Sequence, residues 1–373
     1  MLFRSKISKV LGSEAQRIAA LQHDADVYVI NIENIVWLCE RKEIKQFTNL
    51  VLDESHKWKE PSTRRFKSLK KHIKSFQRRV CLTGTPSPQT VADLWAQVGI
   101  LDLGERLETS LTRFREKYLE PDQINRQTRV VYSWKPKPQS VTIIQQKIKD
   151  ICFSLKAEDY LELPKLTKLY HIIDIDAQVR TQYDTFKKDM VTDFGAGVIT
   201  ASTAATLAGK LLQFTSGAVY GEDGKSQEVH SAKLEFLESI MEESSCPTLI
   251  FYHFKHSLER IKKCFPTAVV LDNDNIEAWR SGQIRMLLAH PQSWGAGANL
   301  QCNAGETVKI VWLDLPWSSE SYTQGNARAW RQGQEKPVVI HHLMIKDTID
   351  DRVKNVLEGK MNLQDAIMES LKL

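Results

Sequence analysis

The rest of the chain is organised around one short stretch, Leu50-Val-Leu-Asp-Glu-Ser-His56. Its three apolar residues can form a buried strand that runs directly into Asp53 and Glu54, so two carboxylates emerge together at the strand's carboxyl end, where α/β sheets bind ligands. One carboxylate of such a pair can hold a Mg²⁺ ion that bridges phosphate oxygens, while its neighbour orients an attacking water. An acidic pair is also a common solvated end of a strand, so its meaning depends on motifs elsewhere in the chain.

The composition is that of an ordinary globular protein. The 373 residues are 42% hydrophobic and 26% charged, which is enough chain for two domains with full cores. No apolar run approaches the roughly 18 residues of a membrane span, and the first residues lack the apolar core of a signal peptide, so we expect an intracellular protein with no membrane partner. The six cysteines are scattered without a C-x-x-C pair, which predicts neither a zinc site nor a disulfide framework.

Positive charge is concentrated between residues 57 and 79, although the net charge of the whole chain is only +5. The segment contains a single acid and ten basic residues, which are Lys57, Lys59, Arg64, Arg65, Lys67, Lys70, Lys71, Lys74, Arg78 and Arg79. A basic block interleaved with Trp58, Phe66 and Phe76 is the electrostatic footprint of a surface that binds a polyanion. The helical spacing of Phe66, Leu69 and Ile73 also fits the solvated side of an amphipathic helix, and one helix can serve both purposes.

Short apolar strands alternate with helical patterns along most of the chain, and polar turns follow several strands. In the first part, strands are predicted at 27–32, 50–52 and 79–82, the last of which ends in Thr83-Gly84-Thr85-Pro86. In the last part, they are predicted at 248–254, 268–271, 285–289, 308–313 and 338–343. This alternation predicts an α/β fold with two tandem, doubly wound parallel sheets. We expect a first lobe at 1–134, a linker and helical insertion at 135–230, and a second lobe at 231–373.

Two further motifs lie in the second lobe. The turn Ser293-Trp-Gly-Ala-Gly-Ala-Asn-Leu-Gln301 follows a strand, and its glycines allow backbone amides to approach a phosphate or sugar closely. Further on, Gln324, Arg328 and Arg331 form a Q-x-x-x-R-x-x-R pattern. Nearly one helical turn separates the two arginines, so both guanidinium groups are expected on one face, where they can meet charge that develops on a transferring phosphoryl group. Taken alone, the two arginines are better explained as surface salt-bridge residues.

Taken in order, the motifs DESH, TGTP, the strand at 249–254, WGAGANLQ and QGNARAWRQGQ resemble those of Swi/Snf-type superfamily-two helicases, especially phage-borne members. The resemblance covers nearly the whole chain, and several degenerate motifs in a fixed order rarely coincide. It implies two RecA-like lobes that bind ATP and Mg²⁺ in their cleft and move along double-stranded DNA. It also implies a cytoplasmic protein, in a bacterial host cell if the gene is carried by a phage.

The resemblance assigns a role to each matching position. Asp53 would be the Mg²⁺ ligand, Glu54 the hydrolytic carboxylate and His56 a link from nucleotide to DNA. Thr83, Gly84 and Thr85 match the motif that couples hydrolysis to movement. Gly295, Gly297 and Asn299 match a motif near DNA and nucleotide, and Gln324, Arg328 and Arg331 match the arginine-finger motif.

One family motif is missing from this sequence, namely the phosphate-binding loop G-x-x-x-x-G-K-[ST]. Gly209-Lys210 does not supply it, because Leu211 stands in place of Ser or Thr and Ala204 in place of the first glycine. The resemblance begins almost at Met1, so we expect an amino-terminally truncated chain, with apolar sheet surface exposed around 27–32 and 50–52. The sequence therefore leaves two functions open: an ATP-dependent DNA translocase, or a non-hydrolysing DNA-binding module or half of a split motor, completed by a separate polypeptide.

Overall fold

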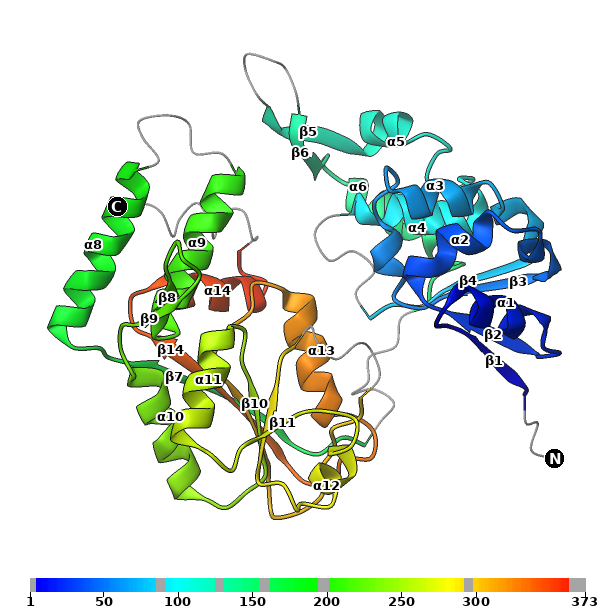
Figure 1. Cartoon of the computed structure of the whole chain (residues 1–373). Coiled ribbons are helices and arrows are strands. Elements are labelled where there is room, and N and C mark those ends of the chain that lie inside the picture. The colour runs from blue at the N-terminus through cyan, green and yellow to red at the C-terminus, as the bar shows by residue number, and fades with distance from the viewer. Residues whose placement is uncertain are drawn as a thin grey trace. The chain divides into compact units, whose positions relative to one another are not determined.

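A computed structural model describes residues 5–84, 91–124, 131–153, 162–193, 201–291 and 298–361. The chain divides into two compact units, Met1–Ser154 and Leu155–Leu373, and each is described by itself (Figure 1). Among the described helices, none combines the length and the apolar character needed to cross a membrane.

The first unit contains short parallel strand pairs, an antiparallel hairpin and covering helices. Its strands are β1 (Ile7–Val10), β2 (Val27–Ile30), β3 (Asn49–Leu52), β4 (Arg78–Cys81), β5 (Leu119–Ile124) and β6 (Val131–Pro136). Its helices are α1 (Glu14–Gln22), α2 (Ile35–Cys39), α3 (Arg64–Lys70), α4 (Asp93–Asp102), α5 (Leu111–Tyr118) and α6 (Ser140–Ile148). β1 pairs with β2, and β3 pairs with β4, all in parallel. The described part of this unit therefore holds two separate two-stranded parallel sheets, whereas we predicted one continuous sheet.

Among the described residues, only one side of these strand pairs is covered. Val10 and Leu52 are buried, and Leu50 and Cys81 pack against the same hydrophobic core. In Figure 1, α2, α3 and α4 lie together above β3 and β4 in the view. The opposite side, named here the open face, carries five large apolar residues that are 45–62% exposed, namely Ile7, Val27, Val29, Val51 and Leu82. The apolar exposure expected around 27–32 and 50–52 is thus confirmed.

The second unit is a six-stranded parallel sheet in the order β11-β12-β10-β13-β14-β7. Its strands are β7 (Leu166–Ile173), β10 (Thr248–Phe251), β11 (Val269–Val270), β12 (Met286–Ala289), β13 (Val308–Trp312) and β14 (Val338–Ile345), with a small antiparallel pair of β8 (Ala218–Tyr220) and β9 (Ser226–Glu228). Its helices are α8 (Ala177–Asp193), α9 (Ala201–Thr215), α10 (Ala232–Glu243), α11 (Lys255–Cys264), α12 (Ile276–Arg280), α13 (Ser319–Ala329) and α14 (Ile349–Leu357).

Both faces of this sheet are covered. Ile310 and Trp312 point into a core shared with α9, α12, α13 and α14, whereas Val311 and Leu313 point into a second core shared with α10 and α11. A near-continuous apolar run is typical of a parallel strand that is buried on both sides, which is why β10 and β13 are fully buried along their length. The second unit is therefore doubly wound, as we predicted for the second lobe.

One strand of the second sheet lies in the segment where we expected a linker. β7 pairs with the edge strand β14 over eight residues, from Leu166 opposite Val338 to Ile173 opposite Ile345. Its residues Leu169 and Ile172 remain partly exposed because β7 is the edge of the sheet. The mixed polar and apolar sequence of an edge strand lacks the continuous apolar run by which the central strands were recognised.

Candidate functional site

The carboxylates of Asp53 and Glu54 emerge where β3 ends. Asp53 is exposed, and its Oδ1 accepts a hydrogen bond from the backbone N–H of Glu54 at 3.0 Å. Glu54 has a left-handed backbone, with φ 49° and ψ 51°, a conformation that costs a non-glycine residue about 1–2 kcal/mol. This turn redirects the chain from the strand into the short 3-10 helix η3 (Ser55–Trp58), so the two carboxylates are held at the sheet edge by a defined local bend.

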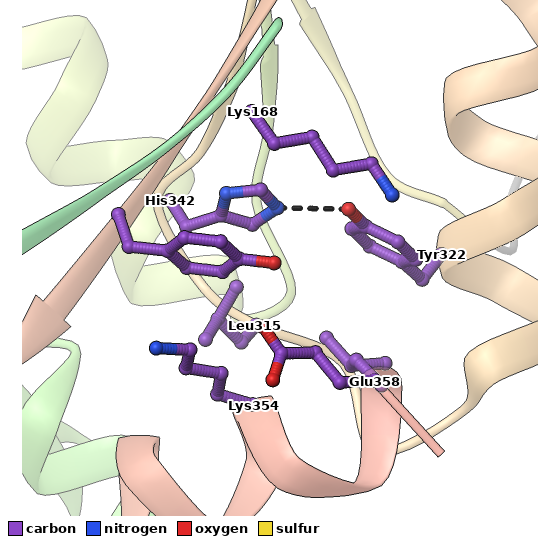
Figure 2. A pocket seen from close by; sticks show the side chains of 8 residues that line it. Lys168, Leu315, Tyr322, His342, Lys354 and Glu358 are labelled. Carbon is purple, nitrogen blue, oxygen red and sulfur yellow. Dashed lines mark hydrogen bonds between the residues drawn. The ribbon is translucent and has the colours of Figure 1, made fainter. Parts of the chain in front are cut away.

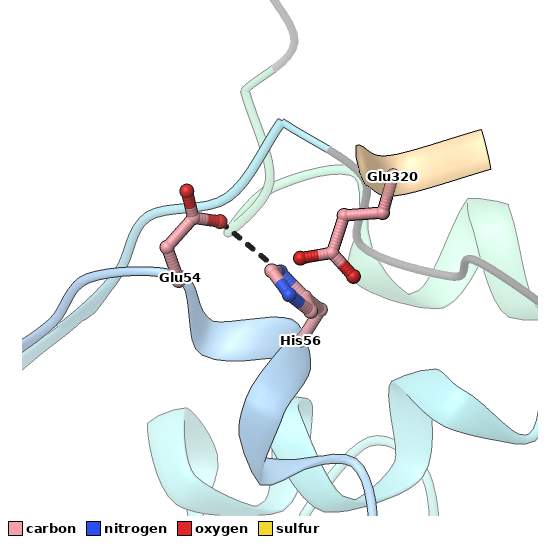
Figure 3. Close-up of side chains that lie close together, drawn as sticks. All are labelled: Glu54, His56 and Glu320. Carbon is pink, nitrogen blue, oxygen red and sulfur yellow. Dashed lines mark ion pairs between the residues drawn. The ribbon is translucent and has the colours of Figure 1, made fainter. Parts of the chain in front are cut away.

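A buried histidine connects this bend to the polar turn after β4. His56 Nδ1 lies 3.2 Å from Glu54 Oε2 and 3.0 Å from Thr83 Oγ1. Figure 3 shows the pairing of His56 with Glu54; Glu320, also labelled there, belongs to the second unit. The β3–β4 pairing continues into this region, because Leu82 N–H donates to Leu52 O at 2.9 Å and Ser55 N–H donates to Leu82 O at 2.9 Å. Two motifs 27 residues apart in sequence thus meet through their side chains.

A residue that the sequence did not single out holds the turn in place. The Ser55 hydroxyl donates to Gln97 Oε1 at 2.8 Å, and both side chains are buried. Gln97 Nε2 in turn donates to the carbonyl of Asp93 on the same helix, α4. A buried polar side chain in an otherwise apolar helix was the available signal, because such a group needs a hydrogen-bond partner.

Asp53 offers a suitable ligand for Mg²⁺. Mg²⁺ prefers hard oxygen ligands, and protein sites often supply it with only one or two carboxylates. The exposed Asp53 carboxylate has one oxygen engaged by the Glu54 N–H, which leaves the other available as a single ligand. The donor set at the end of β3 therefore fits the ion, and Asp53 is the residue that would hold it.

Gly84 is described and has open space where a Cβ would lie, whereas Thr85 lies outside the described residues. Within the part of the chain that the structure describes, the packing around Gly84 does not require a glycine. Its place in the coupling motif remains a prediction.

The basic segment at 57–79 separates into structural and exposed residues. Trp58, Phe66 and Phe76 are buried in the core, so these aromatic side chains are not available to stack on bases, contrary to the interleaved surface that we expected. The helical spacing that placed Phe66 on an apolar face was the better guide.

Several of the basic side chains have protein partners. Arg64 pairs with Glu40 at 2.9 Å, Lys59 lies 3.6 Å from Asp93, and Arg65 donates to the carbonyl of Lys57 at 2.8 Å. Arg79 donates to three backbone carbonyls of its own unit. The exposed lysines for which the structure records no ion pair within the described residues are Lys57, Lys67, Lys70, Lys71 and Lys74. These five form the part of the block that is available to a polyanion.

The two arginines of the second unit do not share a helical face. α13 ends at Ala329, so Arg328 lies in its last turn while Arg331 lies beyond it. Arg328 is buried, which lowers its pKa, and the nearby positive charge of Arg331 lowers it further. Arg331 is exposed and donates from Nη1 to Asn299 Oδ1. The expectation of two arginines on one face was therefore wrong, because the helix stops between them.

Hydrogen bonds nevertheless connect Leu300 and Cys302, at the end of the glycine-rich turn, to Arg328 and Gln334 of the arginine motif. Leu300 N–H donates to the carbonyl of Arg328 at 2.9 Å, and the buried Gln334 side chain bonds both backbone groups of Cys302 at 3.0 Å. Gly295 and Gly297 lie outside the described residues. Asn299 is therefore the one predicted residue of the glycine-rich turn whose contacts are described. Gln324, on α13, donates from Nε2 to Glu320 Oε1 at 3.2 Å.

A small cavity of about 60 Å³ lies between the sheet and α13 and α14 (Figure 2). In its wall, His342 Nδ1 is 2.9 Å from the carbonyl of Leu169, which can only accept, so Nδ1 carries the proton and Nε2 accepts from Tyr322 O–H at 2.9 Å. Burial lowers the pKa of His342 to about 4, which keeps the ring neutral and this arrangement intact. The hydrogen bond between Tyr322 and His342 thereby joins β14 to α13, the helix that carries Gln324 and Arg328.

One further Gly-Lys dipeptide is followed by a serine, namely Gly224-Lys225-Ser226, with Val219 where the first glycine of a phosphate loop belongs. It forms the turn between the antiparallel strands β8 and β9, and Lys225 N–H donates to Asp223 Oδ1 at 3.0 Å. A phosphate loop connects a strand to the amino-terminus of a helix. This hairpin turn has no such helix and does not replace the missing motif.

Comparison with known proteins supplies the remaining evidence. Residues 5–221 match the model of the SNF2-related domain. The chain is 34% identical over 388 residues to protein p41 of Acyrthosiphon pisum secondary endosymbiont phage 1, covering 98% of this chain and 82% of p41. It is 23% identical over 350 residues to YwqA of Bacillus subtilis, whose name describes an ATP-dependent helicase/translocase, covering 87% of this chain but only 36% of YwqA. Among solved structures it is similar to the Sulfolobus solfataricus SWI2/SNF2 ATPase core in complex with dsDNA, with a TM-score of 0.42 and 19% identity, over 99% of this chain and 78% of that one.

Proposed function

Because the chain belongs to the SNF2-related domain family, we propose that it acts in an ATP-dependent DNA translocase or helicase of the Swi/Snf type, which couples ATP hydrolysis to movement on duplex DNA. The observation that carries the proposal is the contact between the two strand-end motifs, in which His56 Nδ1 lies 3.0 Å from Thr83 Oγ1 and 3.2 Å from Glu54 Oε2. A motor needs such a connection, because a change at the nucleotide must be passed to the part that holds DNA.

In this proposal each residue at the end of β3 has one task. Asp53 would hold Mg²⁺, which would neutralise negative charge on the phosphate oxygens. Glu54 would orient the attacking water. His56 passes the state of Glu54 to Thr83, the first residue of the Thr-Gly-Thr motif, because His56 Nδ1 lies 3.2 Å from Glu54 Oε2 and 3.0 Å from Thr83 Oγ1. The left-handed backbone of Glu54 keeps its carboxylate at the sheet edge.

In the second unit, Arg331 is the better candidate to touch a transferring phosphoryl group. Its guanidinium is exposed and is oriented by Asn299, whereas that of Arg328 is buried. We assign Arg328 a positioning role, since its carbonyl bonds to Leu300 and its side chain lies inside the unit. Gln324, Gly295 and Gly297 keep the roles that the family motifs imply.

The exposed lysines at 57–74 are proposed to contact the phosphates of double-stranded DNA. Binding of this kind is independent of base sequence and weakens with salt, because each neutralised phosphate releases counterions. The buried aromatic residues of the segment take no part in DNA binding in this proposal, since they belong to the core.

A second candidate function is a DNA-binding module that does not hydrolyse ATP by itself. The observation that favours it is the absence of G-x-x-x-x-G-K-[ST] from the 373 residues, together with the hairpin position of Gly224-Lys225-Ser226. Without a phosphate loop, Asp53 and Glu54 present negative charge to the nucleotide phosphates, so nucleotide affinity is expected to be poor.

Duplex DNA binding tests what the two candidates share. We expect fluorescence anisotropy to show salt-dependent binding, with Lys70→Glu/Lys71→Glu reducing the slope of log affinity against log salt by about 0.9 for each phosphate that is no longer neutralised. The matched control is Lys262→Glu/Lys263→Glu, an adjacent exposed pair at the end of α11, which should leave the slope unchanged. If both double variants change the salt slope equally, the exposed lysines at 57–74 are not the DNA-binding surface.

ATP hydrolysis separates the two candidates. If this chain lacks a means of binding the phosphates, its hydrolysis with duplex DNA should not exceed that of Glu54→Gln. A DNA-stimulated rate that disappears in Glu54→Gln would instead show that another part of the chain binds the phosphates, and would favour the complete motor over the DNA-binding module.

A further inference from the structure

The two edges of the second unit's sheet differ in length. β11 is two residues long, whereas β7 pairs with β14 over eight residues in unbroken register. Proteins commonly protect a sheet edge with a short strand, a proline, a bulge or charged side chains, because an unpaired edge can bind another strand. β11 is protected by its shortness. β7 contains neither a proline nor a bulge, and Lys168 is its one charged residue at neutral pH.

The outer side of β7 presents backbone groups that can pair with another strand. Val338 N–H donates to Lys165 O at 2.9 Å, and Lys346 N–H donates to Ile173 O at 3.0 Å, so the odd-numbered residues face β14. Successive residues of a strand point their N–H and C=O groups to opposite sides, so the even-numbered residues face away from β14. These residues are Leu166, Lys168, Tyr170 and Ile172. Within the part of the chain that the structure describes, no hydrogen bond to their backbone groups is recorded.

The sequence of β7 is complementary to itself in one antiparallel register. If a second β7 lies alongside with Leu169 opposite its own copy, outward-facing residues meet outward-facing residues, as the hydrogen-bonded pairs of an antiparallel ladder require. Leu166 then lies opposite Ile172, and Lys168 lies opposite Tyr170. Leu169, which is 38% exposed, and Ile172, which is 49% exposed, each meet an apolar side chain, while the ammonium of Lys168 meets an aromatic ring.

The neighbouring registers fit less well. A register centred on Lys168 would place two ammonium groups directly opposite each other, and like charges in that position are destabilising. A register centred on Tyr170 would leave Leu166 without an opposite residue in the second β7. Only the register centred on Leu169 pairs all four outward-facing residues and keeps the lysines apart.

We propose that β7 is a dimerisation edge, which pairs antiparallel with β7 of a second copy of this chain about a twofold axis at Leu169. A twofold interface must be self-complementary, since residue i contacts residue j and residue j contacts residue i. The two six-stranded sheets would continue as one. This inference goes beyond the proposed function, because it involves neither nucleotide nor DNA.

Sedimentation equilibrium of the full chain between about 1 and 100 µM tests the interface, and we expect a reversible monomer–dimer equilibrium. Leu169→Glu would place two carboxylates opposite each other at the axis and should weaken dimerisation at least about ten-fold. Leu169→Lys should do the same. An equimolar mixture of the two variants should associate again, because opposite charges then meet at the axis. Such rescue requires that residue 169 faces its own copy, and it shows that both variants are folded.

Val51→Glu is the matched control. Val51 is an exposed apolar strand residue like Leu169, but it lies on the open face of the first unit. Its substitution should leave dimerisation unchanged. Association that is lost in Val51→Glu and kept in Leu169→Glu would assign self-association to the open face and overturn the proposal.

Hydrogen exchange of the unsubstituted chain gives a second readout that does not depend on the folding of any variant. The amides of Lys168, Tyr170 and Ile172 should become protected as protein concentration rises, because they bond only in the dimer. The amide of His171, which faces β14, should be protected at every concentration.

Three results would overturn the dimerisation edge. They are a chain that stays monomeric at about 100 µM, dimerisation that Leu169→Glu does not weaken, and outward-facing amides whose exchange is independent of concentration. None of these measurements requires ATP hydrolysis or DNA binding, so failure of the dimerisation edge and failure of the proposed function remain distinguishable.

Discussion

The two units of this chain solve the same packing problem to different extents. In the second unit, alternate residues of β13 enter two separate cores, and its five residues are all buried. In the first unit, alternate residues of β3 give one buried position, Leu52, and one exposed position, Val51. Both units use parallel strands, so the difference lies in the second covering layer. A parallel pair with one bare apolar face lacks the burial that stabilises its counterpart.

The largest expected effect concerns the buried ion pair that joins α10 to α14 in the second unit. Lys233 on α10 lies 2.8 Å from Asp350 on α14, and both side chains are almost fully buried. Asp350 also accepts hydrogen bonds from the Thr215 hydroxyl at 3.0 Å and from Ile345 N–H at 2.9 Å. Asp350→Ala leaves a buried ammonium without its partner and should lower the free energy of unfolding by about 3–5 kcal/mol.

Urea denaturation of the second unit measures this loss. The exposed pair between Lys346 and Asp174 provides the control, since Asp174→Ala should cost less than about 1 kcal/mol. A loss for Asp350→Ala no greater than that for Asp174→Ala would mean that the second unit does not depend on its buried pair.

A smaller effect is expected within the basic segment of the first unit. Arg79 donates to the carbonyls of Leu101 at 3.0 Å, Ile73 at 3.2 Å and Phe76 at 3.4 Å, whereas its neighbour Arg78 is exposed on the other face. Arg79→Ala should therefore destabilise the first unit by about 1–3 kcal/mol, and Arg78→Ala should change it little. Thermal unfolding of the two variants checks this difference, and similar losses would show that the two faces of β4 are not distinct.

The smallest expected effect is the change in the stability of the second unit for each unit of pH. Burial, followed by the nearby charge of His171, lowers the pKa of His341 to about 4, and burial lowers that of His342 to about 4. The pKa of a histidine in the unfolded chain is near 6.5. Between that pH and about pH 4, these histidines bind protons in the unfolded chain but stay neutral in the folded unit. Stability is therefore complete above about pH 6.5 and is lost as pH falls toward 4, by at most about 1.4 kcal/mol per pH unit for each histidine.

Urea midpoints at pH 7 and pH 5 measure that slope. His342→Gln should flatten it, while His23→Gln, at an exposed position of the first unit, should not. A slope that is unchanged in His342→Gln would assign the pH dependence to other groups.

Sequence reasoning succeeded where apolar patterning is strong. All five strands predicted between 248 and 343 are present; β10, β12, β13 and β14 are runs of mostly buried residues, and β11, at the edge of the sheet, is half-buried. β7 and the β5–β6 hairpin were missed, since their sequences mix polar and apolar residues in a way that also describes a linker. The Lys-Pro-Lys-Pro stretch at 135–138 overlaps the end of β6.

At the candidate site, the sequence predicted which residues stand at strand ends but not how they connect. The meeting of His56 with Thr83 follows from the parallel pairing of β3 and β4, which spacing alone does not specify. The separation of Arg328 from Arg331 depends on where α13 stops, and helix ends are the least certain part of a sequence-based prediction. The polar Gln97 in an apolar helix signalled a need for a hydrogen-bond partner, but that the partner is Ser55 depends on a tertiary contact.

Native-state hydrogen exchange compares the two units most directly. If the missing layer is what distinguishes them, amides of β10, β13 and β14 should exchange only through global unfolding of the second unit. Amides of β3 and β4 should then exchange much faster, through local opening of a sheet covered on one side. Equal protection of β3 and β13 in the chain alone would contradict the account, because it would mean that the open face costs the first unit nothing.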